Sequence, residues 1–147
     1  MIKTSVIAIS FVAMLLGSSA VRAQSAAEPS GVWQTQAGDA RVKVSKCGGG
    51  LCGVIVSVRD KIDPATGKPA VDDKNPNPAL KNRSMVGLTL FSSMKPAGPN
   101  KWSGKIYNAD DGSTYASNVS VTSPDVLRVE GCVGPICGGE NWTRVGR

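Results

Sequence analysis

Apolar and polar residues alternate in short runs along most of the chain beyond residue 30. Between Arg41 and Lys46, for example, basic residues alternate with Val42 and Val44. A period of two is typical of a strand that buries one face. No stretch after residue 23 shows helical periodicity of convincing length. The pattern therefore predicts an all-β protein.

Eight runs of this kind follow one another, separated by Gly-, Pro- and Asn-rich turns. The expected strands span residues 31–36, 40–46, 52–58, 86–93, 101–107, 113–121, 125–132 and 141–146. Short connections join antiparallel neighbours, and eight antiparallel strands can close around side chains or one small ligand. We predict one domain over residues 31–147, an eight-stranded antiparallel up-and-down barrel, with a β-sandwich as the alternative fold.

The second and third expected strands do not agree on a register. If Cys47 faces Cys52 directly, Val44 lies opposite Ile55 and the two faces mix. A shift by one residue would align the valines of both strands, with residues 54, 56 and 58 on one side, but would separate the cysteines. A bulge in the turn at residues 48–50 would reconcile the two demands, and we predict one there.

The longest interruption of the pattern is the segment Arg59–Arg83, called the long segment below. It holds four prolines and almost no periodicity. A stretch of this length without regular structure is uncommon in a compact domain and is usually functional or mobile. We expect a loop that could act as a lid over the barrel mouth.

The N-terminus has the pattern of a secretory signal peptide. Lys3 precedes an apolar run over residues 6–16, and small residues lead to a cleavage site after Ala23. The run is too short to span a bilayer comfortably, although a retained membrane anchor is the alternative. Residues 1–23 are thus expected to be removed and residues 24–30 to be a flexible N-terminal segment. The mature chain should be periplasmic or secreted, without a membrane span.

Four cysteines in an exported chain predict disulfides. They form two pairs, Cys47 with Cys52 and Cys132 with Cys137, each enclosing four residues rich in Gly or Pro. We favour these two local bonds, each across the mouth of a hairpin, over bonds between the two hairpins. Four thiolates could bind zinc in a reducing compartment, but the spacing and the absence of His disfavour a metal site.

Charge and composition exclude several functions. Without residues 1–23 the chain keeps 15 basic and 11 acidic residues, a net charge of +4. The basic residues are scattered without interleaved aromatic residues, so we expect no nucleic-acid partner. The chain has no His, which excludes every His-dependent catalytic triad. The carboxylate pairs 72–73 and 110–111 are interpreted as solvated turn residues, and we predict no catalytic residue and no cofactor.

The first predicted strand carries Trp33, and the last predicted strand carries Arg144. In a sheet that closes on itself the first and last strands are neighbours, so Trp33 can lie against the guanidinium of Arg144. The alternative is that Trp33 is an ordinary core side chain and Arg144 an exposed terminal charge.

The sequence also resembles a known family. The stretches GVWQT, CGGGLCGVIV, LKNRSMVG, WSGKIYNADDGSTY and LRVEGCVGPICGGENWTRV, with Asp73-Lys74-Asn75-Pro76, are together similar to a bacterial exported family known as domain of unknown function 2147. The resemblance covers essentially all of the mature chain. It implies a lipocalin-like (calycin) barrel, a periplasmic or secreted location, and closure by Gly31, Trp33 and Arg144. It implies no activity.

Four residues are the candidates for contact with a ligand. Trp102, Tyr107 and Tyr115 would line a pocket, and Arg83 would meet the polar end of its occupant. The alternative is that the aromatic rings fill a solid core, while Arg83 ties the long segment to the barrel through a salt bridge, with Asp73 as the candidate partner.

Three hypotheses about function follow. The first is a binding protein for a small apolar or amphiphilic molecule held in the barrel. The second is a structural or interaction protein of the cell envelope that holds no ligand. The third is an enzyme that uses acidic turn residues such as Asp73 or Asp111. The sequence does not give the oligomeric state.

Overall fold

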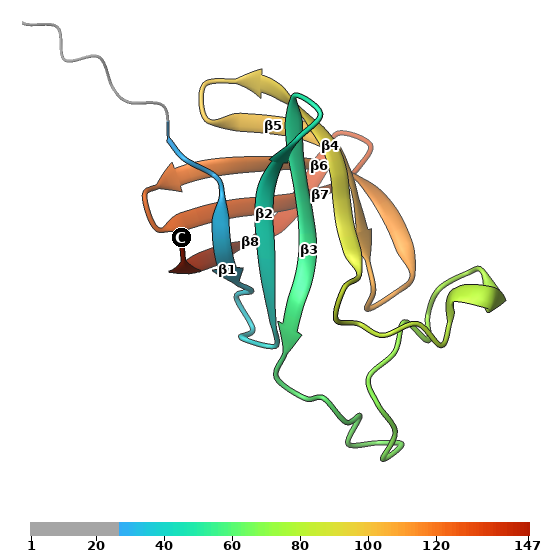
Figure 1. Ribbon diagram of the computed structural model, residues 1–147. Helices are drawn as coiled ribbons and strands as arrows, with labels where there is room; N and C mark the ends of the chain where they lie inside the picture. Colours follow the sequence, from blue (N-terminus) through green and yellow to red (C-terminus); the bar gives the residue numbers. More distant parts are fainter. Residues whose placement is uncertain (1–26) are drawn as a thin grey trace, which may run out of the picture.

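The computed structural model describes residues 27–147, and the predicted signal peptide and residues 24–26 lie outside this range. Eight antiparallel strands form one closed barrel in which each strand pairs with the next along the chain and the last pairs with the first (Figure 1). The predicted up-and-down barrel is confirmed, and the sandwich alternative is wrong. Within the described range, no helix is long and apolar enough to cross a membrane.

The strands lie close to the predicted positions, with two clear differences. β4 starts three residues later than expected and runs further, and β8 starts five residues earlier because its hairpin with β7 continues up to the tip. The elements are β1 (Gly31–Gln34), β2 (Ala40–Cys47), β3 (Gly50–Val58), the 3-10 helix η1 (Pro78–Leu80), β4 (Thr89–Gly98), β5 (Lys101–Asn108), β6 (Ser113–Ser123), β7 (Val126–Val133) and β8 (Ile136–Gly146).

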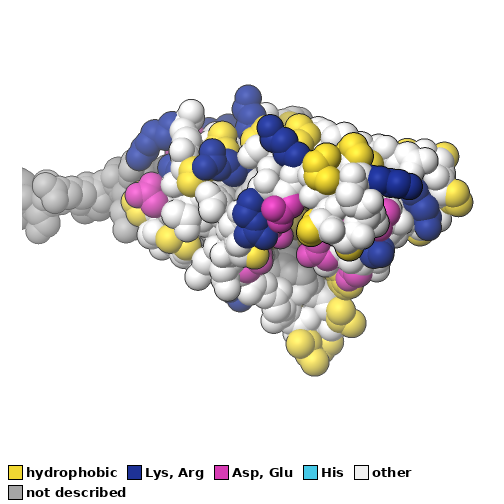
Figure 2. All heavy atoms as spheres, turned by 90° about the horizontal axis from the view of Figure 1, so that it is seen from below, with side chains coloured by type: hydrophobic (Ala, Val, Ile, Leu, Met, Phe, Trp, Pro, Cys, Tyr) yellow, Lys and Arg dark blue, Asp and Glu magenta, His cyan; other side chains and the backbone are white. Residues whose placement is uncertain are grey.

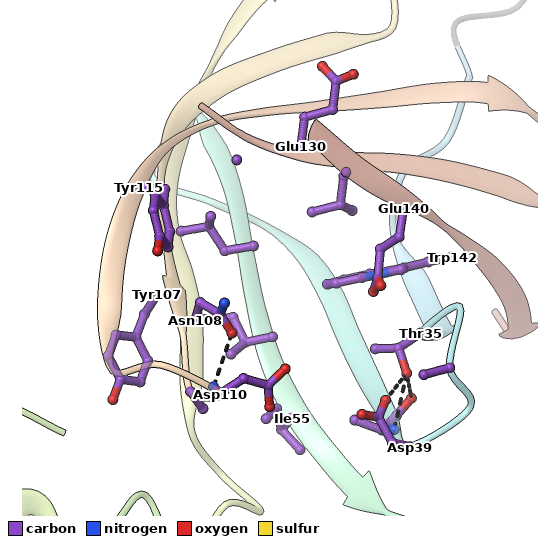
Figure 3. A pocket seen from close by; sticks show the side chains of 18 of the residues that line it. Thr35, Asp39, Ile55, Tyr107, Asn108, Asp110, Tyr115, Glu130, Glu140 and Trp142 are labelled. Atoms are coloured by element: carbon purple, nitrogen blue, oxygen red, sulfur yellow. Dashed lines mark hydrogen bonds between the residues drawn. The ribbon is translucent and has the colours of Figure 1, made fainter. Parts of the chain in front are cut away.

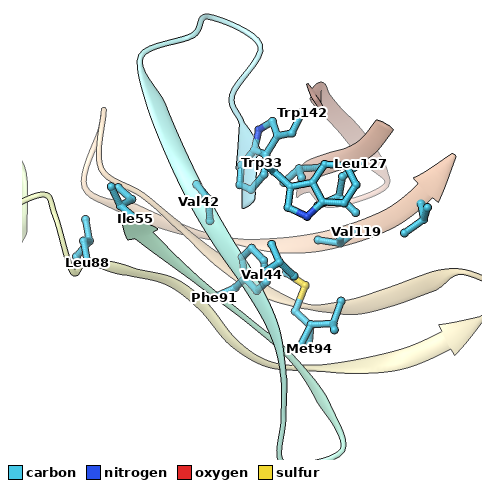
Figure 4. Packing of buried hydrophobic residues seen from close by; sticks show 13 residues of the cluster. Trp33, Val42, Val44, Ile55, Leu88, Phe91, Met94, Val119, Leu127 and Trp142 are labelled. Carbon is cyan, nitrogen blue, oxygen red and sulfur yellow. The ribbon is translucent and has the colours of Figure 1, made fainter. Parts of the chain in front are cut away.

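The core consists of the inward-facing side chains of the strands, because successive residues of a strand point to opposite faces. Trp33 and Met94 are fully buried near its centre (Figure 4). The buried apolar residues are Trp33, Val42, Val44, Leu51, Ile55, Leu88, Phe91, Met94, Val119, Val121, Leu127, Val129 and Trp142.

The register between β2 and β3 differs from both registers considered above. Cys47 pairs with Gly50, and Val42 with Ile55. The inward face of β3 therefore carries Leu51 and Ile55, while Val56 is 40% exposed. The bulge lies between Arg41 and Val42, at the far end of the hairpin, so the prediction of a bulge in the turn is wrong. The turn itself is tight, because residues 48 and 49 are glycines that both adopt positive φ.

Both predicted disulfides are present, Cys47–Cys52 and Cys132–Cys137, and the described chain has no free cysteine. Their settings differ. Cys132 and Cys137 are directly opposed in the ladder between β7 and β8, whereas Cys52 pairs with Ser45, so the first bond runs diagonally across its hairpin. Two such bonds fit an oxidising environment outside the cytoplasm.

One end of the barrel, called the closed end below, is sealed around Arg144. The guanidinium lies over the ring of Trp33, with Cζ 4.1 Å from the ring centroid. Its Nη1 donates to the carbonyl oxygen of Ser30 and its Nη2 to that of Glu28, both at 2.6 Å, and its Nε donates to that of Pro124 at 2.9 Å. The predicted contact is therefore made, by an arginine whose side chain is only 7% exposed.

Gly31 is required by the same arrangement. It has a φ of 146°, which side chains rarely adopt, and a Cβ at this position would collide with Arg144 and with the carbonyl of Gly146. Glycine permits both the conformation and the close approach of the guanidinium. The spacing Gly-x-Trp thus places a small residue beside the arginine and a ring beneath it.

Residues 27–30 cover the closed end, although they belong to the segment 24–30 that was predicted to be flexible; residues 24–26 of that segment lie outside the described range. Pro29 is fully buried, and its carbonyl accepts a hydrogen bond from Nε1 of Trp33 at 2.9 Å. The amide of Ala27 donates to the side chain of Asn100, on the turn between β4 and β5. Residues 27–30 are thus a packed part of the barrel.

Candidate functional site

The other end of the barrel, called the open end below, contains a cavity of about 440 Å³ (Figure 3). It lies inside the ends of the strands and beside the turns that join β1 to β2 and β5 to β6. A volume of this size lies within the range of small-molecule sites. The bordering residues are Thr35, Ala37, Asp39, Ala40, Ile55, Met85, Leu90, Ile106, Tyr107, Asn108, Ala109, Asp110, Tyr115, Val129, Glu130, Gly131, Val133, Gly138, Gly139, Glu140 and Trp142.

Two glycines leave this space unfilled. Gly131 on β7 and Gly138 on β8 are paired in the ladder and both border the cavity. A Cβ at Gly138 would meet nothing within 4 Å, and one at Gly131 would meet only the side chain of Tyr115 at ordinary contact distance. Side chains would therefore fit at both positions, and their absence opens the barrel interior at this end.

The inner wall of the cavity is apolar. Ile55 and Val129 are buried, and Leu90 and Ile106 are half-buried and pack against the same core. The indole of Trp142 forms part of the wall from β8, as Figure 3 shows. This surface suits an apolar group and offers few partners for a polar one.

Three carboxylates stand at the rim. Asp39 lies in the turn after β1 and accepts a hydrogen bond from the hydroxyl of Thr35. Glu140 lies on the inward face of β8, where its Oε1 accepts from Nε1 of Trp142 at 2.5 Å. Asp110 lies in the turn between β5 and β6, and Figure 3 shows its side chain directed toward the mouth.

Tyr115 borders the cavity from the inner face of β6. Its hydroxyl donates to the carboxylate of Asp111 at 2.5 Å. This hydrogen bond, together with one from the amide of Ser113, lowers the pKa of Asp111, and it raises the pKa of Tyr115. Tyr115 is thus held in place from the turn, with its ring at the cavity.

Tyr107 borders the cavity, but its side chain points away from the mouth, toward the long segment (Figure 3). Its hydroxyl donates to Oδ1 of Asp72 at 2.6 Å. Asp72 is fully buried, and its Oδ2 also accepts from Arg83 Nε and Asn75 Nδ2, both at 2.8 Å. The interpretation of Asp72 as a solvated turn residue is therefore wrong. Arg83 does tie the segment down, but to Asp72, and Asp73 contacts Lys74.

The buried carboxylate of Asp72 stays charged. Burial alone raises its pKa, but the hydrogen bonds from Tyr107, Asn75 and Arg83 and the charge of Arg83 outweigh burial, so the pKa lies below the ordinary value. The pKa of Tyr107 is raised, by burial and by its bond to Asp72. The four groups form a structural clamp that fastens the long segment to β5.

The long segment lies beside the mouth. In the described part of the chain, none of residues 59–83 borders the cavity, and only Met85 of the connection from β3 to β4 does so. Isolated bridges join Ile62 to Pro69 and Val71 to Ser84, so the segment has its own local order. Figure 1 shows it extending away from the barrel. In this structure the long segment therefore does not cover the cavity as a lid.

Two of the four predicted ligand contacts, Tyr107 and Tyr115, border the cavity, and Trp102 and Arg83 do not. Trp102 is half-buried against the core on β5, opposite Val119. Sequence analysis missed Glu140, Trp142 and the two glycines. The sequence did contain a signal for the β8 residues. Because every second residue of a strand faces the same side, Trp142, Glu140 and Gly138 must share the inward face with Arg144.

The described residues contain no group of three or more His, Cys, Asp or Glu placed to hold a metal ion. One buried hydroxyl is without a partner: Ser117 is 4% exposed, and its Oγ makes no hydrogen bond. It lies on the inner face of β6, two residues beyond Tyr115 and paired with Gly131. The site as a whole combines an apolar wall, aromatic rings and an acidic rim.

The comparisons with known proteins agree with this architecture. No curated protein sequence matches the chain significantly. Among solved structures, it is similar to protein HP1028 from the human pathogen Helicobacter pylori, which is described as belonging to the lipocalin family. The identity is 28% and the TM-score 0.67, over 80% of this chain and 83% of the other. The family model for uncharacterised proteins conserved in bacteria, DUF2147, matches residues 31–144. The chain therefore belongs to the DUF2147 family, and its fold is a lipocalin-like barrel.

Proposed function

We propose that the protein binds a small apolar or amphiphilic molecule in the cavity at the open end of the barrel. The observation that carries the proposal is the empty interior opposite Gly131 and Gly138, next to walls formed by Ile55, Val129 and Trp142. A barrel of eight strands can be packed solid, whereas this one has a buried core that includes Trp33 and Met94 and a cavity at its open end. The role is binding, without a chemical step on the ligand.

The arrangement of the walls supports an amphiphilic rather than a purely apolar molecule. Apolar side chains lie inside, and the polar side chains of Thr35, Asp39 and Asp110 lie at the rim. An apolar part of the ligand would leave water on entering, worth about 25 cal/mol for each Å² buried. A polar part would remain near solvent.

A neutral apolar fluorophore tests the cavity directly. N-phenyl-1-naphthylamine should bind the mature protein at one saturable site with a rise in fluorescence. Gly138→Leu places an apolar side chain in the open space, and we expect it to weaken binding at least about tenfold, or about 1.4 kcal/mol. Because its Cβ meets no atom, the variant should keep its thermal stability.

Thr143→Leu is the matched control. It introduces the same side chain on the same strand, at an exposed position outside the cavity. Binding should be unchanged in this variant. A wild-type protein that does not bind the fluorophore, or a Gly138→Leu variant that binds as well as Thr143→Leu, would contradict the proposal. Native mass spectrometry of protein taken from its own cells should in addition show an added mass.

A second candidate function is a ligand-free role in the cell envelope through contact with another protein. It is supported by the tip of the β7–β8 hairpin, where Val133 is 71% and Ile136 76% exposed. The Cys132–Cys137 bond links the two strands next to this tip. Crosslinking in cells from a reactive group at position 136 should trap a protein partner, and no fluorophore should bind.

Both candidate functions place the protein outside the cytoplasm. The disulfides support this location. The proposed cleavage after Ala23 concerns residues outside the described range, and N-terminal sequencing of the secreted protein would test it.

A further inference from the structure

The charge around the cavity is the opposite of the charge of the whole chain. The mature chain is expected to be basic, yet Asp39, Asp110 and Glu140 stand at the rim, and among the described residues no Lys or Arg borders the cavity. Figure 2, which views the molecule from below Figure 1, shows Asp and Glu side chains around a hollow in the middle of this face. A concave site lined by one sign of charge attracts ligands of the opposite sign.

These carboxylates are not neutralised by neighbours. Within residues 27–147 none of the three forms a salt bridge. By contrast Glu130, which also borders the cavity, pairs with Arg128. Among the described residues, the carboxylates of Asp39 and Glu140 each accept a single neutral hydrogen bond, from Thr35 and Trp142 respectively. A carboxylate left with only one neutral donor keeps lone pairs for a cation.

The aromatic residues point to the same ligand chemistry. The indole of Trp142 lies directly beside the carboxylate of Glu140, and the ring of Tyr115 lies across the cavity (Figure 3). Aromatic faces attract ammonium groups through their quadrupole, and Trp does so most strongly. Carboxylates and aromatic rings together favour an ammonium group and disfavour a carboxylate or sulfate group.

We propose that the ligand is a cationic amphiphile, with its ammonium group among Asp39, Asp110 and Glu140 and its apolar part against Ile55, Leu90 and Ile106. The proposal rests on the proposed binding function and names the class of ligand for that same cavity. It also explains why the rim is acidic in a chain that is basic overall.

Three probes with the same chain length test the charge preference. Decylammonium, decanol and decanoate compete with N-phenyl-1-naphthylamine, each at concentrations that form no micelles. We expect decylammonium to bind at least about tenfold more tightly than decanoate, with decanol between them. The preference should shrink at high ionic strength, because salt screens exposed charges.

Variants of the rim assign the preference to particular carboxylates. Glu140→Gln keeps an oxygen that can accept from Trp142, so it removes the charge and preserves the local fold. It should reduce the preference for decylammonium about threefold, and the triple variant with Asp39→Asn and Asp110→Asn should abolish it. Asp125→Asn removes the same charge from a position on the turn between β6 and β7 that is 67% exposed and faces Arg144 at the closed end, far from the rim, and it should leave the preference unchanged.

The outcomes separate the two proposals. If the fluorophore does not bind, the binding function fails and the ligand class fails with it. If the fluorophore binds but decanoate competes as well as decylammonium, only the inference about charge is wrong. If Asp125→Asn reduces the preference as much as Glu140→Gln does, net charge rather than the rim sets it, and the inference is also wrong.

Discussion

The two ends of the barrel place similar residues in different surroundings. At the closed end Trp33 packs under Arg144, whose Nε, Nη1 and Nη2 each donate to a backbone carbonyl, and Pro29 is buried beside them. At the open end Trp142 has a carboxylate, Glu140, beside it and open space in front. Both indole N–H groups are hydrogen-bonded within the chain, but Trp142 donates to a carboxylate that has no salt-bridge partner among the described residues.

Under the proposed function, this difference separates stability from binding. Residues at the closed end satisfy one another, so changes there should cost folding free energy. Residues at the open end are incompletely satisfied, so changes there should alter binding more than stability. The clamp around Asp72 lies at the open end but behaves as a structural element, because every oxygen of its carboxylate is hydrogen-bonded.

The largest effect should come from Arg144→Ala. The change removes the contact with Trp33 and leaves the carbonyls of Ser30, Glu28 and Pro124 without their donor. We expect a loss of about 3 kcal/mol or more in the free energy of unfolding, measured by urea denaturation. Arg144→Lys should recover only part of it, because lysine keeps the charge without the planar fork. Full stability of the alanine variant would refute the distinction between the two ends.

Asp72→Asn should have the next largest effect, about 2 kcal/mol, because the amide cannot accept all the hydrogen bonds that the carboxylate accepts. Its folded pKa lies below the ordinary value of 3.8. The carboxylate therefore stabilises the fold above that pH, and the contribution is lost as pH falls through the folded pKa. Urea denaturation at a series of pH values below 5 should show a shallower acid dependence in Asp72→Asn than in the wild type. Identical profiles would contradict a charged, clamped Asp72.

The two disulfides allow a matched comparison of the ends. Each closes a small loop, so replacing either pair by Ser should cost about 2 kcal/mol or less. Loss of Cys132–Cys137 should also weaken fluorophore binding, since that bond holds the hairpin that carries Gly131 and Gly138. Loss of Cys47–Cys52 should leave binding unchanged. If the two double variants affected fluorophore binding equally, the expected difference between the two ends of the barrel would be contradicted.

The smallest effect should come from Lys46→Ala. Lys46 pairs with Glu28 at 3.0 Å, but both side chains are more than half exposed. Exposed pairs of this kind contribute less than about 1 kcal/mol. The pKa of Glu28 is lowered to about 2 mainly by the backbone hydrogen bond from Ser30, with Lys46 contributing less. The variant should therefore unfold at nearly the same urea concentration as the wild type, and a loss well above 1 kcal/mol would show that this pair is a main element of the closed end.

The sequence predicted the barrel and the closed end for a physical reason. Alternation with a period of two is written into each strand, and the contact between Trp33 and Arg144 follows once the first and last strands are neighbours. The register between β2 and β3 was harder to predict. The extra residue Val56 opposite the gap between Arg41 and Val42 changes which face is buried, and no turn residue signals it.

The cavity was only partly predictable. A pocket depends on side chains that are missing, and Gly131 and Gly138 are unremarkable until their pairing in the ladder is known. The burial of Asp72 was missed for a similar reason. Its partners Tyr107 and Arg83 lie 35 and 11 residues away in the chain, and only the fold brings them together.

The closed end of the barrel depends on residues 27–30, which cover it. The carbonyl oxygens of Glu28, Pro29 and Ser30 belong to the first few residues after the expected cleavage site. A shortened chain that starts at Gly31 would lack these carbonyl groups, so Arg144 would lose two of its hydrogen-bond acceptors and the indole of Trp33 would lose its own. The closed end thus depends on residues that lie close to the expected cleavage site, and protein prepared for binding measurements should keep residues 27–30.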